Sequence, residues 1–422
     1  MKVWILNHYA GSMLLEKGGR HYNFAKYLGQ QGYEPVVFCC NAKHNSRAEQ
    51  YFDGNSLWQE HMAEEISTPF VFVKARAYVG NGKQRVLNMV DFYRNVKKAA
   101  KEYAKEHGKP DVILASSVHP LTLVAGIQLA KHFGVRCICE IRDLWPESIV
   151  AYSSRLKKSN PIIKLLYLGE KWIYKKADAI IFTMEGGRDY IIEKGWDTAH
   201  GGPVDSNKVH HINNGVDLEV FDYNRNHNAI KDPDLDDPDT FKVIYTGSLR
   251  EVNDIGTLLT VAEIIQQNDN NRVKVLIYGD GDQREQLEQE AKNRLISDVV
   301  FKGLVQKNSI PYILSKANLC LLHWKPTPIT KYGMSMNKFF EYFAAAKPIL
   351  SNSVAGYDLI QKYQCGISKA IGSADEYAEC IIKMSKTPES DFDTFCKNAR
   401  CAAEDYNFKK LTSDLIEVIE NV

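Results

Sequence analysis

The chain has 422 residues, which is too long for one ordinary hydrophobic core and fits about two domains of roughly 200 residues each. Charged residues make up 25% and hydrophobic residues 44% of it, as in an ordinary globular protein, and the net charge of +1 argues against a general nucleic-acid-binding protein. The nine cysteines form no CxxC pair, which argues against a disulfide framework and a zinc site.

The first apolar run, at 3–6, is a buried strand pattern that is far too short for a signal peptide or a membrane span. No later segment reaches the length of about 18 apolar residues that indicates a transmembrane helix. We therefore expect a cytoplasmic protein that at most contacts the inner face of the plasma membrane.

Short apolar runs alternate with helical patterns along the whole chain, which predicts α/β units around parallel sheets. In the first half, the predicted strands are 3–6, 35–40, 111–116, 135–141 and 179–183, and helices are predicted at 21–31 and 90–107. The second half restarts the pattern, with predicted strands at 241–247, 272–279, 298–303, 319–323 and 348–352. Between the halves, 222–240 is rich in Asn, Asp and Pro and is predicted to be a surface loop.

These elements predict two Rossmann-like parallel-sheet domains at 1–212 and 213–404, followed by a helix at 405–422 that crosses back to the first domain. Two open α/β sheets whose strands point their carboxyl ends at one another form a cleft. Ligands of such folds usually bind there.

The most informative segment is 331–350, KYGMSMNKFFEYFAAAKPIL, which predicts a turn, an amphipathic helix, a Lys-Pro break and a strand. Lys338 and Glu341 lie three positions apart, so they share one face of the helix. A helix start and Lys338 suit an anion, and Glu341 can accept hydrogen bonds from two hydroxyls. Phosphate plus diol is the outline of a nucleotide sugar. The alternative is a surface helix that merely carries a Lys and a Glu.

Two predicted strands of the second half end in glycine-containing turns, whose candidate residues are Gly247, Ser248, Arg250, Gly279 and Gly281. A ligand lying over both strand tips would present phosphate to Arg250 and to backbone N–H groups of the first turn, and its nucleoside to the second. Val305, after the next strand, can touch the base through its backbone.

In the first half, Gly18 and Gly19 follow the first strand and precede a helix, which allows a phosphate or sugar to approach the backbone closely. The dinucleotide pattern GxGxxG is absent there, and a flexible loop is the alternative. His119 follows strand 111–116 and can hydrogen-bond a sugar hydroxyl; the alternative is a histidine that caps or packs the next helix.

Strand 135–141 ends in charged residues, of which Arg142 and Asp143 are candidates for polar contacts in the cleft. A structural ion pair between Arg142 and a nearby carboxylate is the alternative. Lys83 and Arg85, in the run 78–88, are further candidates for an acceptor surface or for a membrane surface. The stretch 153–176 is basic and aromatic, and includes Arg155. It predicts either a helix on an anionic membrane surface or a crossover helix with a solvated basic face.

Together these features resemble the family 4 retaining glycosyltransferases with the two-domain GT-B fold, especially bacterial enzymes of capsule, O-antigen and exopolysaccharide assembly. The motifs that carry the resemblance are GG at 18–19, DLWPES at 143–148, NNGVD at 213–217, YTGSLREVND at 245–254, YGDGDQREQL at 278–287 and the segment 331–350. The resemblance covers essentially the whole chain.

The resemblance implies transfer of a sugar from a nucleotide-diphosphate sugar, with retention, to a glycan or polyprenyl-linked acceptor in cell-surface polysaccharide biosynthesis. No cofactor, metal or nucleic acid is implied, and peripheral membrane contact through 153–176 fits such an acceptor. The catalytic candidates are Arg250, Lys338 and His119. The donor-binding candidates are Gly19, Gly247, Ser248, Gly279, Gly281, Val305, Tyr332, Gly333, Met334, Ser335, Asn337 and Glu341.

The sequence departs from the family pattern at three positions. Gly333 stands where the first Glu of a Glu-x7-Glu motif is usual, Ser248 where an Arg is usual, and Asn253 where a Lys is usual. Two other functions therefore stay open: a catalytically weak GT-B binding subunit, and a nucleotide-sugar epimerase that would change the donor sugar without any acceptor.

Overall fold

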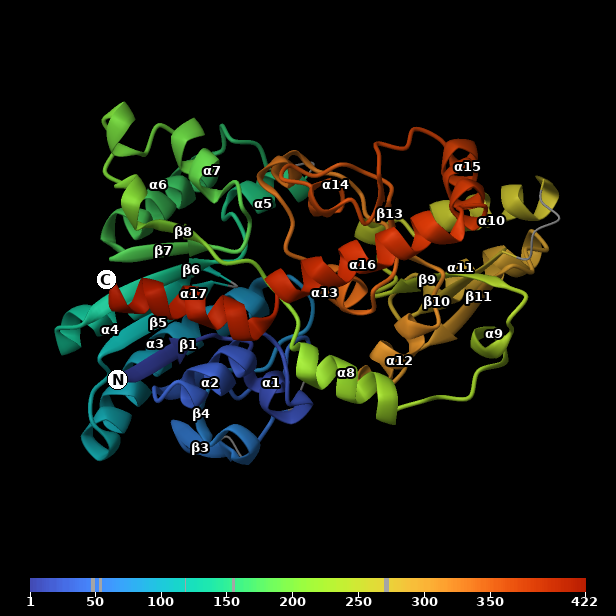
Figure 1. Ribbon diagram of the computed structural model, residues 1–422. Coiled ribbons are helices and arrows are strands. Elements are labelled where there is room, and N and C mark those ends of the chain that lie inside the picture. Colours follow the sequence, from blue (N-terminus) through green and yellow to red (C-terminus); the bar gives the residue numbers. More distant parts are fainter. Residues whose placement is uncertain (47–49, 53–54, 118, 154–155, 269–272) are drawn as a thin grey trace. The chain divides into compact units, whose positions relative to one another are not determined.

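The computed structural model describes residues 1–46, 50–52, 55–117, 119–153, 156–268 and 273–422. Arg155 of the predicted basic stretch and Arg272 of a predicted strand lie outside these residues. The chain forms two compact units, Met1–Asn213 with Phe408–Val422, and Asn214–Asn407. Each unit is a sheet with helices on both faces (Figure 1). The predicted α/β architecture of two parallel-sheet domains is confirmed.

The first unit contains an eight-stranded sheet in the order β3-β4-β2-β1-β5-β6-β7-β8, in which only the β3–β4 pair is antiparallel. The strands are β1 (Lys2–Leu6), β2 (Glu34–Cys40), β3 (Trp58–Ala63), β4 (Thr68–Val73), β5 (Val112–Ser117), β6 (Arg136–Ile141), β7 (Ala179–Phe182) and β8 (Val209–His211). All five predicted strands are present. The edge strands β3 and β8 were missed because one is largely polar and the other very short, and β4 was missed with them.

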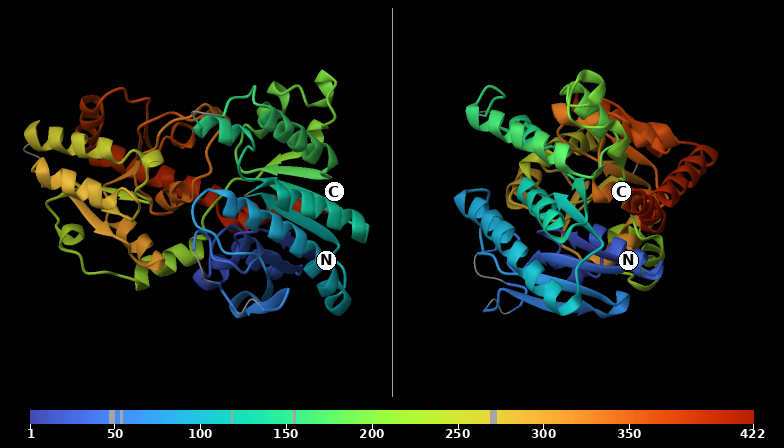
Figure 2. Two further views of the ribbon diagram at one scale, coloured as in Figure 1. Left: turned by 180° about the vertical axis from the view of Figure 1, so that it is seen from behind. Right: turned by 90° about the vertical axis from the view of Figure 1, so that its left-hand side faces the viewer.

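Helices cover both faces of this sheet. They are α1 (Gly11–Glu16), α2 (Arg20–Gln30), α3 (Lys83–His107), α4 (Pro120–Phe133), α5 (Glu147–Tyr152), α6 (Pro161–Lys176), α7 (Gly187–Glu193) and α17 (Phe408–Glu420). α17 packs against α2 on one face, and α3, α4 and α6 form a layer on the other (Figure 2). The Phe24 and Phe408 rings, 5.7 Å apart, join α2 to α17. The predicted helix at 90–107 begins earlier, at Lys83.

The second unit contains a six-stranded parallel sheet in the order β11-β10-β9-β12-β13-β14. The strands are β9 (Phe241–Thr246), β10 (Val273–Tyr278), β11 (Val299–Gly303), β12 (Leu319–Leu322), β13 (Ile349–Ser351) and β14 (Gly366–Ser368). The five predicted strands are present, and the missed strand, β14, is a three-residue edge strand.

The helices of this unit are α8 (Leu218–His227), α9 (Pro233–Asp236), α10 (Gly256–Asn268), α11 (Arg284–Asn293), α12 (Ile310–Ser315), α13 (Asn337–Ala344), α14 (Leu359–Tyr363), α15 (Ala374–Ser385) and α16 (Glu389–Asp405). The prediction of a surface loop over 222–240 was partly wrong, because α8 and α9 lie there. The Asp217 carboxylate caps α8 through Val220 N (3.2 Å), and the Asp232 carboxylate caps α9 through Asp234 N (3.1 Å).

Candidate active site

Helix α13 is fixed firmly in the second unit. Phe339, Phe340 and Phe343 are buried, which confirms the predicted amphipathic helix. The Tyr342 hydroxyl accepts hydrogen bonds from Thr246 N (3.0 Å) and Thr246 Oγ1 (3.2 Å) at the end of β9. The helix is therefore fastened to the carboxyl end of the central strand.

Lys338 lies on the partly exposed side of α13, beside the turn that follows β9. Its Nζ donates to Tyr245 Oη (3.2 Å) and lies 4.2 Å from the Tyr245 ring centroid. A Cβ atom built on Gly247 would lie 3.4 Å from the same Nζ, so the ammonium and the turn are immediate neighbours. Within the described residues Lys338 has no carboxylate within 4 Å. An anion over Gly247 would meet this ammonium directly.

Burial lowers the pKa of Lys338 to about 7, although the nearby Glu341 carboxylate opposes this shift. Burial also raises the pKa of Glu341, against the opposing charges of Lys307 and Lys338. A lysine with such a pKa exchanges its proton near neutral pH. A bound diphosphate would favour its charged form.

The glycines in the turn after β10 are needed because this turn packs closely on the turn after β9. A Cβ atom on Gly279 would lie 1.8 Å from the Gly247 carbonyl oxygen, and one on Gly281 would lie 2.1 Å from the Leu249 carbonyl oxygen. Leu249 N donates to Asp280 O (2.9 Å), which joins the two turns. The close packing of one turn on the other therefore requires glycine, whatever ligand binds.

The two positions at which the family usually carries cations hold a neutral pair. Asn253 Nδ2 donates to Ser248 O (2.7 Å) and to Ser248 Oγ (2.9 Å), and Tyr245 Oη donates to Ser248 O (3.2 Å). These bonds close the turn after β9 on itself. Positive charge at this turn is therefore left to Lys338 beside it and to Arg250, whose side chain is exposed at its edge.

The turn before α13 carries the other donor-binding candidates. Tyr332 is buried, Gly333 has φ +104° and ψ 179°, and Ser335 accepts hydrogen bonds from Asn214 N (3.2 Å, to Oγ) and Asn214 Nδ2 (2.7 Å, to O). Met334 and Val305 are partly exposed, and Asn337 is exposed at the first turn of α13, where no side chain caps the helix. Phe339 N donates to Met336 O (3.1 Å), so among the described residues the N–H groups of Asn337 and Lys338 are the ones left for a ligand.

The backbone at Gly333 explains why a carboxylate is absent there. A positive φ with extended ψ is essentially restricted to glycine and costs other residues about 1–3 kcal/mol. We expect Gly333→Ala to lower the free energy of unfolding by that amount, and Gly333→Glu not to restore a family-like carboxylate contact. Urea denaturation of both variants checks this; a Gly333→Glu protein as stable as the original would contradict it.

In the first unit, a buried polar network lies at the carboxyl ends of β1, β5 and β6. Arg20 Nε donates to Glu140 Oε1 (2.7 Å), and Ser116 Oγ donates to Glu140 Oε2 (2.6 Å). His21 Nε2 lies 2.9 Å from Glu140 Oε2, and Asn7 Nδ2 lies 2.7 Å from His21 Nδ1. Since the amide nitrogen can only donate, His21 is neutral and gives its Nε2–H to Glu140.

Glu140, at the charged end of the predicted strand 135–141, lies at the centre of this network. Although burial raises the pKa of Glu140, the Arg20 charge and the contacts with His21 outweigh it and hold this pKa well below the usual value. Arg142 and Asp143 stand outside the network, at the turn after β6, and neither forms an ion pair within the described residues. The suspected ion pair of Arg142 is thus replaced by the Arg20–Glu140 pair, which sequence reasoning missed.

His119 is almost completely buried at the start of α4, where its Nε2 lies 2.6 Å from His8 Nδ1. Burial, together with the smaller effect of the Arg85 guanidinium, lowers the pKa of His119 to about 3, so the imidazole is neutral. Among the described residues, His119 Nδ1 has no hydrogen-bond partner. A neutral imidazole with one unsatisfied nitrogen can bind a hydroxyl but is a poor proton donor.

The other first-unit candidates, Arg85, Lys83 and Gly19, have different surroundings. Arg85, whose Nη1 donates to Asn81 Oδ1 (2.5 Å), lies near enough to lower the pKa values of His8 and His119. Lys83 is exposed at the first residue of α3, and among the described residues no hydrogen bond or ion pair joins it to these side chains. Gly19 begins α2 with φ +96°, and a Cβ atom there would lie 3.1 Å from Met13 Cγ.

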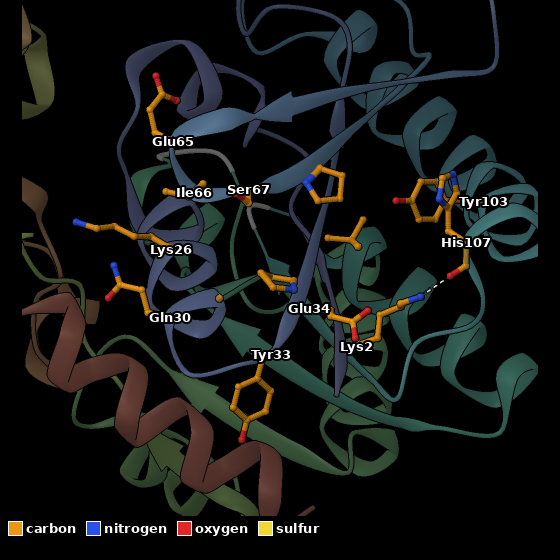
Figure 3. Close-up of a pocket in the computed structure, with 14 residues that line it drawn as sticks. Lys2, Lys26, Gln30, Tyr33, Glu34, Glu65, Ile66, Ser67, Tyr103 and His107 are labelled. Atoms are coloured by element: carbon orange, nitrogen blue, oxygen red, sulfur yellow. Dashed lines mark hydrogen bonds between the residues drawn. The ribbon is translucent and has the colours of Figure 1, made fainter.

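A hollow of about 620 Å³ lies elsewhere in the first unit, and Figure 3 shows its lining. Lys2 and Glu34, which begin β1 and β2, line it, as does His107, whose carbonyl accepts a hydrogen bond from Lys2 Nζ. It therefore lies at the amino ends of the strands, away from the carboxyl ends at which α/β sheets bind ligands. We do not assign it as the active site. Across the described residues, no group of three or more His, Cys, Asp or Glu side chains could hold a metal ion.

Comparisons with known proteins agree with this arrangement. The family model described as Glycosyltransferase Family 4 matches residues 20–220, and the model described as Glycosyl transferases group 1 matches residues 240–387. A search of curated proteins found no match.

Among solved structures, Anabaena HepE in complex with UDP is similar over 100% of both chains, at 15% identity and a TM-score of 0.68. Trehalose 6-phosphate synthase from Burkholderia multivorans is similar over 99% of this chain and 98% of its own, at 14% identity and a TM-score of 0.70. A Rickettsia africae glycosyltransferase covers 100% of this chain and 99% of its own, at 12% identity and a TM-score of 0.63.

The two family models together match most of the chain, one on each side of the boundary between the sheets. The solved structures share its fold along its whole length. The chain belongs to the glycosyltransferases with the GT-B fold.

Proposed function

We propose that this glycosyltransferase moves a sugar from a nucleotide-diphosphate sugar, with retention, to a glycan or polyprenyl-linked acceptor in cell-surface polysaccharide biosynthesis. The observation that carries the proposal is the Lys338 ammonium, which pairs with no carboxylate of the described residues and lies beside the Gly247 turn at the end of β9. A site for a diphosphate needs such a charge next to free backbone N–H groups.

In this proposal Lys338 and the first N–H groups of α13 stabilise the diphosphate as it leaves, with Arg250 adding charge from the edge of the turn. Glu341 accepts hydrogen bonds from the ribose hydroxyls. The bond from the sugar to the diphosphate breaks while the acceptor hydroxyl attacks the same face, and the departing phosphate takes the hydroxyl proton. No metal is needed in this scheme, because Lys338 and Arg250 supply the positive charge.

One guide to the donor is the HepE protein, whose structures contain UDP and UDP-glucose. UDP-glucose is therefore the first donor to test, beside UDP-galactose, UDP-N-acetylglucosamine and GDP-mannose. A polyprenyl-linked acceptor would place the protein at the inner face of the plasma membrane, with 153–176 as the contact segment.

The test uses the full chain and needs no known acceptor, because water can replace it slowly. We expect at least one donor to raise the melting temperature, as a ligand at 100 times its Kd adds about 2.7 kcal/mol to the native state. We then expect release of the nucleoside diphosphate in the presence of EDTA. Proton NMR should show the α-anomer of the free sugar first, which is the outcome of retention.

Four results would contradict the proposal. Release of the β-anomer first would exclude retention, and loss of turnover in EDTA would exclude metal independence. Conversion of the donor sugar into its epimer would indicate an epimerase instead. Binding of donors without turnover, with water and with a panel of lipid-linked sugars, would indicate a binding subunit, as the neutral Ser248–Asn253 pair and Gly333 would then suggest.

A further inference from the structure

Helix α6 has an apolar face that does not pack against the rest of its unit. The side facing the sheet consists of Ile163, Glu170, Ile173 and Tyr174, all buried. Asn160 caps this helix by accepting a hydrogen bond from Ile162 N (2.9 Å), and Pro161 follows at its first position, so its beginning is well defined.

The unused face is formed by large side chains that solvent reaches. Ile162 and Leu165 are each 67% exposed, Leu168 is 65% exposed and Trp172 is 40% exposed. Scattered apolar residues are normal on a surface, but these four recur at spacings of three and four residues on one helix. They form a continuous stripe, which we call the outer stripe of α6.

The position of the stripe excludes a simple packing role within the unit. At about 3.6 residues per turn, Leu165, Leu168 and Trp172 point roughly opposite to the buried Ile163 and Glu170. The helix is thus apolar on two sides, and only one of them faces the sheet. A crossover helix with a solvated basic face would expose lysines there instead.

The charges around the stripe are all of one sign. Lys164, Lys171 and Lys175 follow one flank, and Lys176 ends the helix. The one acidic residue of α6, Glu170, is buried and accepts hydrogen bonds from Tyr174 Oη and Tyr190 Oη, both at 2.8 Å. The exposed surface of α6 therefore combines apolar bulk with positive charge alone.

The same layer adds further basic residues. α4 packs against both α3 and α6, so the three helices lie side by side on one face of the sheet (Figure 2). On α3, Arg94, Lys98 and Lys101 are exposed along its outer side. A protein with a net charge of only +1 thus gathers positive charge on the layer that carries the stripe.

We propose that the outer stripe of α6 docks onto an anionic lipid bilayer, with the apolar side chains inserted among the acyl chains and the flanking lysines on the headgroups. None of the helices in the described part of the chain is both long and apolar enough to cross a bilayer. The proposal rests on the proposed function, because a polyprenyl-linked acceptor resides in such a bilayer, and it narrows the membrane contact from 153–176 to the outer stripe of α6. Its test does not depend on turnover.

The experiment measures co-sedimentation of the full chain with vesicles of phosphatidylcholine alone and with 30% phosphatidylglycerol. We expect at least tenfold stronger partitioning to the anionic vesicles, weakened by 0.5 M salt. The triple variant Leu165→Gln, Leu168→Gln, Trp172→Gln should lose at least tenfold in partitioning. The variant Lys164→Glu, Lys171→Glu, Lys175→Glu should lose the preference for anionic lipid.

The matched control removes apolar exposure elsewhere, by Leu295→Gln with Tyr223→Gln, whose side chains are 81% and 61% exposed. This control should partition within twofold of the original. Equal partitioning of the triple stripe variant and the original, or no binding to anionic vesicles, would overturn the proposal. A dimer that the stripe variant abolishes, without vesicle binding, would assign the stripe to a second copy instead.

Donor hydrolysis separates this proposal from the proposed function. The stripe variant should hydrolyse donor at the original rate while losing vesicle binding. If no donor is hydrolysed by the original chain but vesicle binding and its loss are observed, the docking surface stands and the proposed reaction fails.

Discussion

Replacing Lys338 by alanine is expected to lower donor turnover by about 100- to 1,000-fold, the usual effect of removing one preorganised group that stabilises developing charge. We expect a large loss of turnover because Ser248 and Asn253 hydrogen-bond each other and supply no charge at the turn after β9. Release of nucleoside diphosphate in the hydrolysis assay measures it. Unchanged turnover would remove Lys338 from the mechanism.

The control for this variant is Lys383→Ala, which removes an exposed lysine on α15 of the same unit. It should leave turnover unchanged. Lys338→Ala should also not destabilise the fold. The pKa of Lys338 is lowered in the folded chain, so its charged form opposes folding. This penalty is absent above its unfolded value and fully present below about pH 7.

The lowered pKa of Lys338 also predicts how donor affinity depends on pH. The diphosphate of a nucleotide sugar keeps its charge between pH 6 and 9, whereas Lys338 of the free protein loses its proton as the pH rises through about 7. Donor affinity should therefore fall as the pH rises through this range. Lys338→Arg should flatten the profile, because arginine stays charged.

The second large effect is expected on stability, in the first unit. Glu140→Ala leaves the Arg20 guanidinium buried without this carboxylate, although its Nη atoms still donate to the carbonyl oxygens of Asn213 (2.5 Å) and Ile212 (2.8 Å). Removing one member of a buried ion pair costs about 3–5 kcal/mol, because the other charge remains uncompensated. Urea denaturation at pH 7 measures this loss of unfolding free energy.

The matched control is Asp143→Ala, which removes the exposed carboxylate at the end of the same strand and should change stability by less than about 0.5 kcal/mol. The pH dependence gives a second readout. The pKa of Glu140 is depressed in the fold, so its contribution is present above its unfolded value and is lost as the pH falls through the folded value. Glu140→Ala should therefore lose less stability to acid than the original; equal acid sensitivity would contradict this.

The sequence by itself determined the architecture and the helix that carries the donor-site candidates. Buried parallel strands are continuous apolar runs, and the spacing of Phe339, Phe340 and Phe343 specifies a helix with Lys338 and Glu341 on its other side. These signals are local, so they can be recognised in the sequence without knowledge of the fold. Short or polar edge strands such as β3, β8 and β14 lack them.

Tertiary structure alone decided what the polar residues do. Arg20 and Glu140 are 120 positions apart, and Ser248 meets Asn253 only because the turn after β9 folds back. Glycines that suggested ligand contact at 279 and 281 are required by the backbone of a neighbouring turn. On α6, the apolar side chains of 153–176 divide between the sheet and the solvent. The hydrogen-bond partner and the burial of a side chain depend on packing between elements that are distant in the sequence. The periodicity of the sequence does not specify that packing.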